Sequence, residues 1–442
     1  MRTSETRERV VVTGMGIVCP LGHDVASLWE GLLSGRSGVG RTTLFDASTF
    51  PTTFDAEVKG YDFRRHIRHP EFHEGCSRGS GFVLGATVQA CKQAKIEVET
   101  SKPADGIDRT RMGIYLGAGE GSLDNDSFFG SIIAGWDAEQ QRMVWPRSIR
   151  VAMGQMSAVR ELEQEPNMAA GHTAMLTGAR GPVRSCLTAC AASTQAVGEA
   201  SMIIRRGDAD IMVAGGVHSM IHPLGITGFN LLTALSQRND SPETASRPFS
   251  GTRDGFVIGE GAAILILESL TSARRRGVPI LAEIAGYGCS SDAFRVTDMH
   301  EEGRGAAQAM IAALADAGLT TDDIDYINTH GTSTQENDSI ETLAIKTVFK
   351  DRARQVPVSS IKSMLGHLIG AAGAAEIIAS VLAIHHNIVP PTMNLHDPDP
   401  KLDLDYVPNA PRKMPVNTVM KESFGFGGQN NVVILKRFRE EA

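Results

Sequence analysis

The sequence predicts an α/β protein built from two related halves. Short apolar runs typical of buried strands alternate with helical stretches rich in Ala and Gly. Segments of the first 200 residues also have weakly similar counterparts after residue 280. The distance along the chain between the two members of a pair falls from about 270 to about 175 residues, which is expected if the first copy carries longer loops. The paired segments are 10–22 with 281–293, 112–119 with 324–331, and 183–200 with 356–376.

Eight strands are expected along the chain, and a basic helix end marks the seam between the halves. The expected strands are 10–18, 112–119, 210–216, 262–270, 280–288, 325–331, 356–362 and 431–437. The stretch 270–280 places three arginines before Gly277 and Pro279, a typical helix stop. We therefore expect one half over residues 1–275 and the other over 276–442.

Composition excludes several classes of function. Aromatic residues make up 5% of the chain and the net charge is -8, which argues against nucleic acid, and an acidic partner would have to dock on a local basic patch. Six cysteines without paired spacing argue against a disulfide framework or a zinc site. The N-terminus has no signal pattern, and the apolar stretch 366–384 is interrupted by Glu376, so we expect a cytoplasmic protein with no membrane span.

Cys190 stands among small residues just before a helical pattern that ends at Gly207. An isolated cysteine among alanines is most often a buried filler. At a helix N-terminus, however, unpaired N–H groups and the helix dipole favour the thiolate and lower the pKa of the thiol. Cys190 is therefore a candidate nucleophile.

Two further segments carry candidate site residues. His330 ends an apolar strand and precedes a hydroxyl-rich loop, where a structural role competes with a catalytic one. Asp338 and Glu341 have the D-x-x-E spacing of a helix cap. Lys362 and His367 flank a turn in an apolar segment, where neither is an obvious packing choice.

Glycine-rich segments allow two interpretations. The sequence SFGFGG at 423–428 could aim backbone N–H groups at a substrate oxygen, or could simply form a turn between strands. The segments 14–22 and 117–122 do not complete a nucleotide-binding pattern, so no cofactor is implied.

Taken together, these segments resemble the β-ketoacyl-[acyl-carrier-protein] synthases of the elongating type. The matching motifs occur in the family's order from about residue 9 to residue 437: TACAAS, RPFSGTRDGFVIGEGA, HGTST, KSMLGH and SFGFGG. The resemblance implies the thiolase-like fold, in which a duplicated α/β unit gives five αβαβα layers, and a homodimer.

The resemblance also implies a mechanism for fatty acid synthesis or a specialised lipid or polyketide pathway. Cys190 would hold an acyl group as a thioester, with the backbone N–H groups of Cys190 and Phe426 as oxyanion hole. His330 and His367 would stabilise the enolate that malonyl-acyl-carrier protein forms as CO2 leaves. Neither a metal nor another cofactor is required.

Supporting roles are implied for further residues. Lys362 would organise the histidines and pair with Glu341. Thr332 and Thr334 would bind the phosphopantetheine arm of the acyl carrier protein. Phe424 and Phe426 would gate the acyl pocket.

The chain departs from the family's pattern in four places. Glu422 replaces the usual Asn before SFGFGG and would add a charge near the gate, and Glu120 occupies a pocket-wall position that is usually apolar or small. Residues 125–166 form an atypical insertion. The basic patch that the family would present to an acidic carrier protein is also altered. The nearest candidates for this contact are Arg64, Arg65, Arg68 and Arg78. These departures suggest a specialised member.

Two alternatives remain open from sequence. A non-catalytic chain-length partner of another synthase would share the fold but typically lacks the nucleophile. A thiolase-type or initiating enzyme would pair its Cys and His with a second Cys or an Asn, whereas this chain has two histidines.

Overall fold

Ten strands form one continuous sheet in the computed structural model, which describes residues 7–119 and 124–440. The strand order is β12-β11-β15-β16-β10-β1-β9-β8-β4-β7. The strands of the first half are β1 (Val10–Val18), β4 (Met112–Ala118), β7 (Val183–Cys186), β8 (Ile211–His218) and β9 (Gly261–Ser269). Those of the second half are β10 (Ala282–Ser291), β11 (Tyr326–Asn328), β12 (Val358–Ser359), β15 (Thr418–Gly425) and β16 (Gln429–Lys436).

The two halves of the sheet repeat the same topology. Read outward from the centre, β1-β9-β8-β4-β7 matches β10-β16-β15-β11-β12. The senses of pairing match as well: the two inner pairs of each half are antiparallel and the two outer pairs are parallel. This repeat confirms the duplication, including the three segment pairs expected from sequence. An antiparallel contact between β1 and β10 joins the halves.

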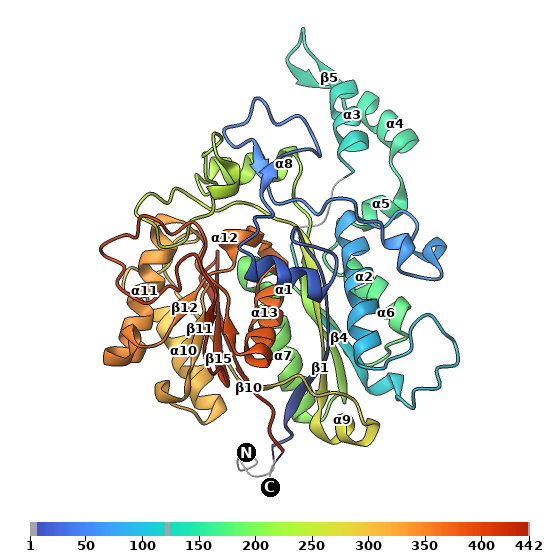
Figure 1. Cartoon of the computed structure of the whole chain (residues 1–442). Helices are drawn as coiled ribbons and strands as arrows, with labels where there is room; N and C mark the ends of the chain where they lie inside the picture. The colour runs from blue at the N-terminus through green and yellow to red at the C-terminus, as the bar shows by residue number, and fades with distance from the viewer. Residues whose placement is uncertain (1–6, 120–123, 441–442) are drawn as a thin grey trace.

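Helices complete five layers around the two halves of the sheet. Helices α7 (Ala192–Arg206) and α13 (Ala372–His386) pack on each other and on strands of both halves, so they form the middle layer (Figure 1). Helices α2 (Arg78–Gln93) and α6 (Met168–Thr177) cover the first half from outside. Helices α10 (Arg304–Ala317) and α11 (Gln335–Phe349) cover the second. The thiolase-like αβαβα architecture is therefore confirmed.

The middle helices also repeat each other in detail. A short 3-10 turn precedes each of them, η5 (Ala189–Ala191) before α7 and η9 (Ile369–Ala371) before α13. Each turn begins on a residue with positive φ, Ala189 at 48° and Ile369 at 40°. Cys190 in the first copy therefore corresponds to Gly370 in the second. The duplicated scaffold offers two equivalent helix N-termini, and one of them carries the thiol.

Burial explains the apolar stretch that ends in α13. In the part of the chain that the structure describes, one helix, Ile369–His386, is long and apolar enough to span a membrane, with mean hydropathy 1.4, but 89% of it is buried inside the fold. Its neighbours are the apolar faces of both sheet halves, so its hydrophobicity is satisfied by the core. The expectation of a buried core helix here was correct.

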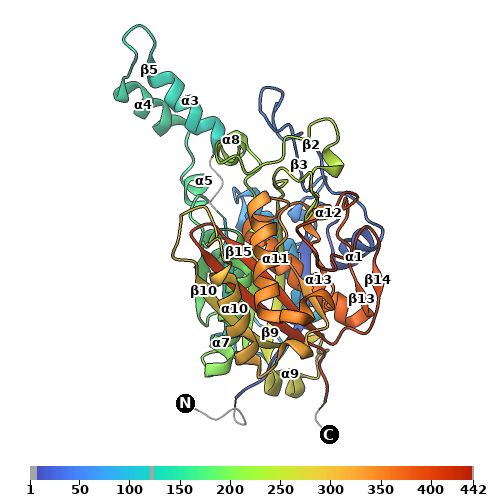
Figure 2. The ribbon, with the colours of Figure 1, turned by 90° about the vertical axis from the view of Figure 1, so that its left-hand side faces the viewer.

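Residues 125–162 form an arm that projects from the layered body (Figures 1 and 2). The arm consists of α3 (Asn125–Gly135), the hairpin β5 (Trp136–Asp137) and β6 (Arg142–Met143), α4 (Trp145–Gln155) and α5 (Ala158–Leu162). It exposes large apolar side chains, among them Ile133, Trp145 and Met153. The atypical insertion is therefore a separate structural element with an apolar surface.

The remaining elements are short or connect the layers. The helices are α1 (Val25–Leu33), α8 (Pro223–Leu231), α9 (Leu270–Arg276) and α12 (Lys362–Leu365). The strand pairs are β2 (Gly40–Arg41) with β3 (Phe54–Asp55) and β13 (Ile388–Val389) with β14 (Arg412–Lys413). As expected at the seam, α9 ends at Gly277, which has φ 61°. The boundary between residues 275 and 276 itself stays a prediction.

Candidate active site

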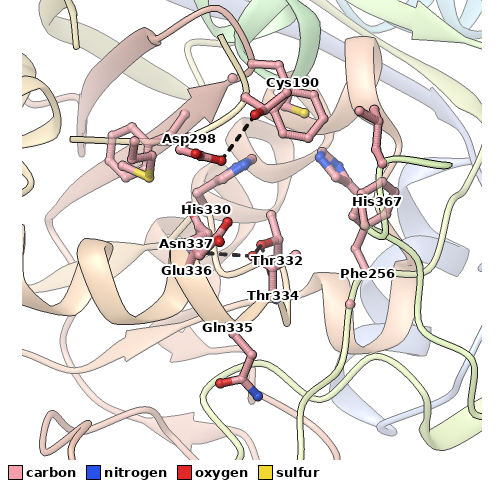
Figure 3. A pocket seen from close by; sticks show the side chains of 18 of the residues that line it. Cys190, Phe256, Asp298, His330, Thr332, Thr334, Gln335, Glu336, Asn337 and His367 are labelled. Atoms are coloured by element: carbon pink, nitrogen blue, oxygen red, sulfur yellow. Dashed lines mark hydrogen bonds between the residues drawn. The ribbon is translucent and has the colours of Figure 1, made fainter. Parts of the chain in front are cut away.

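A cavity of about 310 Å³ brings together residues from both halves of the chain. Cys190 reaches it from η5, His330 from the end of β11, and His367 from the loop between α12 and η9 (Figure 3). One donor atom from each, the Cys sulfur and two ring nitrogens, lies within 4.8 Å of the others. The rings of His330 and His367 meet edge to face at 5.4 Å. The three candidates from distant motifs therefore share one site.

Cys190 sits on a sharp turn between β7 and α7. Ala189 has φ 48°, a left-handed conformation that L-residues rarely adopt, so the turn is held by its surroundings. One of these is Gly425, where a Cβ would lie 2.9 Å from the carbonyl oxygen of Thr188 and 3.3 Å from the backbone nitrogen of Cys190. A side chain at residue 425 would push the turn out of place.

The thiol of Cys190 is protonated in this environment, which corrects the sequence-based expectation. Burial raises the pKa of Cys190 to about 12, although Lys362 and the backbone N–H groups of Cys190 and Phe426 act in the opposite direction. The start of α7 lies where it was expected, but a terminal dipole does not offset removal of the thiolate from water. The same two N–H groups form hydrogen bonds with the sulfur, so they point at the reacting atom.

Both histidines present an N–H group to the cavity. The backbone N–H of Ile369 donates to Nδ1 of His367 at 3.2 Å, so the proton of this neutral ring lies on Nε2, a buried atom with no other partner. Lys362 Nζ lies 3.4 Å from Nδ1 of His330, which must accept because an ammonium group has no lone pair. Burial and the charge of Lys362 lower the pKa of both histidines well below the usual range. Two neutral N–H donors result.

Lys362 pairs with Glu376, and the expected pairing with Glu341 is wrong. The Lys362 ammonium forms an ion pair with Glu376 and donates to the carbonyl oxygen of His330 at 2.5 Å. Glu341 instead accepts the backbone N–H groups of His330 at 2.6 Å and Gly331 at 2.8 Å. Glu376 is reachable because α13 passes directly behind the cavity, whereas Glu341 is turned toward the end of β11.

Two buried residues extend this network and were not recognised as part of the site from sequence. Lys421 Nζ lies 2.7 Å from the second carboxylate oxygen of Glu376, which therefore sits between two lysines. A charged residue inside the apolar helix α13 was the available signal for Glu376. Lys421 offered no comparable signal, since its strand also contains Glu422 and Ser423.

Glu422 does not add a charge at the gate, contrary to expectation. It is fully buried, and its carboxyl group hydrogen-bonds with that of Glu341. Burial and the neighbouring Glu341 raise the pKa of Glu422 well above its usual value. Two carboxylates cannot share such a contact without a proton, so Glu422 is a neutral donor to Glu341.

The hydroxyl loop after His330 lines the same cavity, but its helix cap differs from the expected one. Helix α11 begins at Gln335, and Thr334 caps it by accepting the backbone N–H of Asn337 at 3.3 Å. The D-x-x-E pair therefore lies inside the first turns and is buried, not at the cap. Thr332 and Thr334 face the cavity, with their hydroxyl groups 2.9 Å apart.

The glycine-rich segment is both a strand turn and part of the cavity wall. Gly427 and Gly428 have φ of 83° and 72° and connect β15 to β16. Phe424 and Phe426 line the cavity, and the ring of Phe424 lies 5.9 Å from that of His330. The two interpretations of SFGFGG are therefore compatible, because the turn is what brings the N–H of Phe426 to the sulfur.

The remaining candidates are placed differently. Glu120 lies outside the described residues. Arg78 donates to the buried carboxylate of Glu260 and to the carbonyl oxygen of Val58, so its guanidinium has a structural role. Arg64 pairs with Asp62 at the surface, while Arg65 and Arg68 are exposed nearby.

A metal site is the competing interpretation of the Cys-His-His group. Within the residues that the structure describes, it is the one cluster whose donor atoms could ligate an ion together. In both rings, however, Nδ1 accepts a hydrogen bond, from Ile369 in His367 and from Lys362 in His330, so the Nε2 atoms carry protons and have no lone pair for an ion. The two N–H donors therefore suit acyl transfer better than metal binding.

Comparisons with known proteins identify relatives over nearly the whole chain. The model of the beta-ketoacyl synthase N-terminal domain matches residues 7–273, and that of the C-terminal domain matches 281–396. A 3-oxoacyl-[acyl-carrier-protein] synthase 2 from Coxiella burnetii is 42% identical, over 98% of this chain and 99% of its own length. An enzyme of the same name from Synechocystis is 40% identical over equal shares.

Solved structures agree in fold. One match is a chain from the structure of a type II PKS acyl-carrier protein in complex with its ketosynthase bound to the hexaketide. The TM-score is 0.85 and the sequence identity is 34%, over 98% of this chain and 100% of that chain. A beta-ketoacyl synthase from Burkholderia phymatum matches with a TM-score of 0.85 and 33% identity over the same shares.

Proposed function

Because the chain belongs to the beta-ketoacyl synthase family, we propose that it condenses an acyl group held on Cys190 with malonyl-acyl-carrier protein to give 3-oxoacyl-acyl-carrier protein. It is an acyltransferase of the 3-oxoacyl-[acyl-carrier-protein] synthase type. The observation that carries this proposal is the cluster of Cys190, His330 and His367 within 4.8 Å at one cavity.

The first half-reaction transfers the acyl group to the enzyme. The sulfur of Cys190 attacks the thioester carbonyl, the bond to the carrier's sulfur breaks, and that sulfur takes up the proton that the thiol gives up. The carbonyl oxygen becomes negative in the transition state. It then occupies the position between the N–H groups of Cys190 and Phe426, which already point at the sulfur.

The second half-reaction forms the carbon–carbon bond. The malonyl thioester oxygen accepts the Nε2–H groups of His330 and His367, so the enolate that forms as CO2 leaves is stabilised by two neutral donors. Its carbon attacks the acyl carbonyl, the bond to the Cys190 sulfur breaks, and the sulfur takes up one proton from the solvent. Neutral histidines suit this step, because they donate hydrogen bonds without requiring a buried positive charge.

The supporting residues keep the donors in position. Lys362 holds Nδ1 of His330 and Glu341 holds its backbone, so the Nε2–H faces the cavity. Thr332 and Thr334 offer hydroxyl groups at the cavity wall to the phosphopantetheine arm. Phe424, near the end of β15, and Phe426, in the turn that follows, gate the acyl pocket.

The partner is an acyl carrier protein, and a homodimer is the proposed assembly. The relatives' names include this carrier, and one solved neighbour holds it in a complex.

Strand β7 ends the strand order of the described sheet, and the arm exposes Trp145 (59%) and Met153 (83%). A second copy paired through β7 and embraced by the arm would cover these apolar groups. We also retain the division at residue 275 and a cytoplasmic location.

Acylation of Cys190 tests the proposal directly. The protein is incubated with a series of acyl-acyl-carrier proteins, and the peptide that carries Cys190 is analysed by mass spectrometry. We expect an added acyl mass at Cys190 and none in Cys190→Ala. An unmodified peptide for every chain length would overturn the assignment.

Two measurements separate the alternatives. A non-catalytic chain-length partner would show no malonyl decarboxylation above background when purified alone, whereas a synthase decarboxylates. For a thiolase-type enzyme, His367→Asn should retain condensation, whereas the proposed mechanism predicts its loss because Asn cannot reproduce the reach of the Nε2–H group.

A further inference from the structure

Lys421 is a fully buried lysine that the proposed mechanism does not use. Its ammonium nitrogen lies 2.7 Å from one carboxylate oxygen of Glu376, and its side chain is 0% exposed. The other oxygen of Glu376 already pairs with Lys362, so one lysine would balance the charge of this carboxylate. Buried charges are costly, and apolar groups of similar volume often serve stability equally well. The second lysine therefore needs an explanation beyond charge balance.

The alternation of side chains along β15 turns Lys421 toward the middle layer. Successive residues of a strand point to opposite faces of the sheet. Glu422 contacts the outer helix α11, whereas Lys421 contacts α13 and Ser423 contacts α7, the two helices of the middle layer (Figure 1). Lys421 and Ser423 therefore share the face of β15 that meets the helix behind Cys190.

A chain of hydrogen bonds leads from Lys421 to that helix. The ammonium group donates to Ser423 Oγ at 2.8 Å and to the carbonyl oxygen of Glu422. The hydroxyl groups of Ser423 and Thr194 are hydrogen-bonded at 2.8 Å. Thr194 is held from its other side, because α13 passes so close that a Cβ at Gly373 would lie 2.0 Å from Thr194 Oγ1. The end of β15 is thus tied to both middle helices.

The same end of β15 supplies half of the oxyanion hole. Phe426 directly follows the strand, and its N–H group forms a hydrogen bond with the Cys190 sulfur. Gly425, the last residue of β15, packs against the Cys190 turn, where a Cβ would lie 3.3 Å from the backbone nitrogen of Cys190. Because only two residues separate Ser423 from Phe426, a shift of Ser423 would move this N–H group relative to the sulfur.

We propose that Lys421 is a positioning residue for acyl transfer, which holds Ser423 against Thr194 and so keeps the N–H group of Phe426 where the oxyanion forms. Lys421 acts through Ser423 and the backbone and does not touch the substrate. The proposal rests on the function proposed above, since the oxyanion belongs to the acyl group of that reaction.

Glu376 gives the two lysines one anchor but separate tasks. Lys362 contacts one oxygen of the carboxylate and donates to the backbone of His330, a residue of the decarboxylation step. Lys421 contacts the other oxygen and bonds the end of β15. Without Lys421, Glu376 and Lys362 remain a balanced ion pair. Loss of Lys421 should therefore slow acyl transfer and spare malonyl decarboxylation.

Lys421→Met tests this division, because methionine lacks the ammonium group but fills a similar volume. Acylation of Cys190 by an acyl-acyl-carrier protein is followed over time by mass spectrometry, and decarboxylation by release of CO2 from malonyl-acyl-carrier protein. We expect acylation about 10–100-fold slower, somewhat less than the loss of an oxyanion-hole donor would cause, and little change in decarboxylation. An equal loss in both rates would show a general structural role and overturn the proposal.

Further variants trace the path through the hydroxyl groups. Ser423→Ala and Thr194→Val should each slow acylation, and Lys421→Met combined with Ser423→Ala should be no slower than the slower single variant, because both act on one path. Thr173→Val removes an equally buried helical hydroxyl group from α6 and is the matched control, with both rates unchanged. Additive losses, or an unchanged acylation rate in Thr194→Val, would overturn this path.

The parent protein separates this proposal from the proposed function. If no acyl-acyl-carrier protein acylates Cys190 of the parent, the proposed function fails and this proposal fails with it. If the parent is acylated and Lys421→Met is acylated equally fast, the positioning role is overturned and the synthase activity stands. Thermal unfolding identifies a loss of folding, and the ratio of the two rates stays valid because a smaller folded fraction lowers both alike.

Discussion

The carboxylate of Glu341 accepts the backbone N–H of His330 at 2.6 Å. This contact joins helix α11 to the end of β11 and determines where the imidazole of His330 stands. The second oxygen of the carboxylate holds the next N–H group, that of Gly331, at 2.8 Å. Glu341 is thus a positioning residue that acts on the site through the backbone.

Glu341→Gln should therefore lower kcat with little change in KM. A neutral amide accepts hydrogen bonds more weakly than a carboxylate, and about 1.5–3 kcal/mol for a bond to a charged group corresponds to roughly 10–100-fold in rate. Steady-state kinetics with malonyl-acyl-carrier protein measure both constants. Asp322→Asn, at a side chain that is 86% exposed, is the control and should leave them unchanged. A raised KM with unchanged kcat would contradict the positioning role.

Glu422 should make the protein less stable as the pH rises. Burial raises its folded-state pKa well above the unfolded value, so the folded state retains a proton that the unfolded state loses. The stability linked to this proton is fully present below the unfolded pKa and is lost as the pH rises toward the folded pKa, by up to about 1.4 kcal/mol per pH unit.

Glu422→Gln tests this linkage because it keeps a neutral donor that does not titrate. Urea unfolding of both proteins should show similar free energies of unfolding at acidic pH and an advantage for the variant that grows with pH. Parallel pH profiles of the two proteins would show that Glu422 is not held protonated.

Replacing Glu376 should destabilise the fold strongly. It is 1% exposed and lies between the ammonium groups of Lys362 and Lys421, so Glu376→Gln leaves two buried cations without an anion. Breaking a buried ion pair in this way costs about 3–5 kcal/mol. Chemical denaturation measures the loss, and Asp208→Asn, in the exposed pair with Arg206, should cost less than about 1 kcal/mol. Equal small losses would contradict the role of Glu376 as the shared counter-ion.

Cys190 should become more reactive toward small electrophiles across the alkaline range. Its pKa of about 12 means that the thiolate fraction rises about tenfold per pH unit below that value. Alkylation by iodoacetamide, followed by mass spectrometry of the Cys190 peptide, should therefore increase steeply from neutral pH without a plateau below pH 10. A plateau near neutral pH would mean that the thiolate is stabilised and the raised pKa is wrong.

Local patterns in the sequence were sufficient for the duplicated α/β organisation, whereas the five layers and most of the site were implied by the resemblance of the motifs to one family. Alternating apolar runs and three weakly similar segment pairs indicated a duplicated α/β fold, because buried strands and tight helix packing constrain residue type at each position. The TACAAS, HGTST and KSMLGH segments identified the residues that share the cavity through their joint resemblance to one family, since each segment alone also allowed a structural role.

Partners and protonation states were decided by the tertiary structure. Lys362 pairs with Glu376 and not Glu341, Thr334 and not Asp338 caps α11, and Glu422 is a neutral donor where a charge was expected. Each of these depends on which groups from distant segments meet in a space that water does not enter. Burial raises the pKa of Cys190 for the same reason, whereas a sequence pattern shows only that a helix begins behind it. Residue type and local spacing specify the elements and their chemistry, and desolvation within the assembled layers determines charge and pairing.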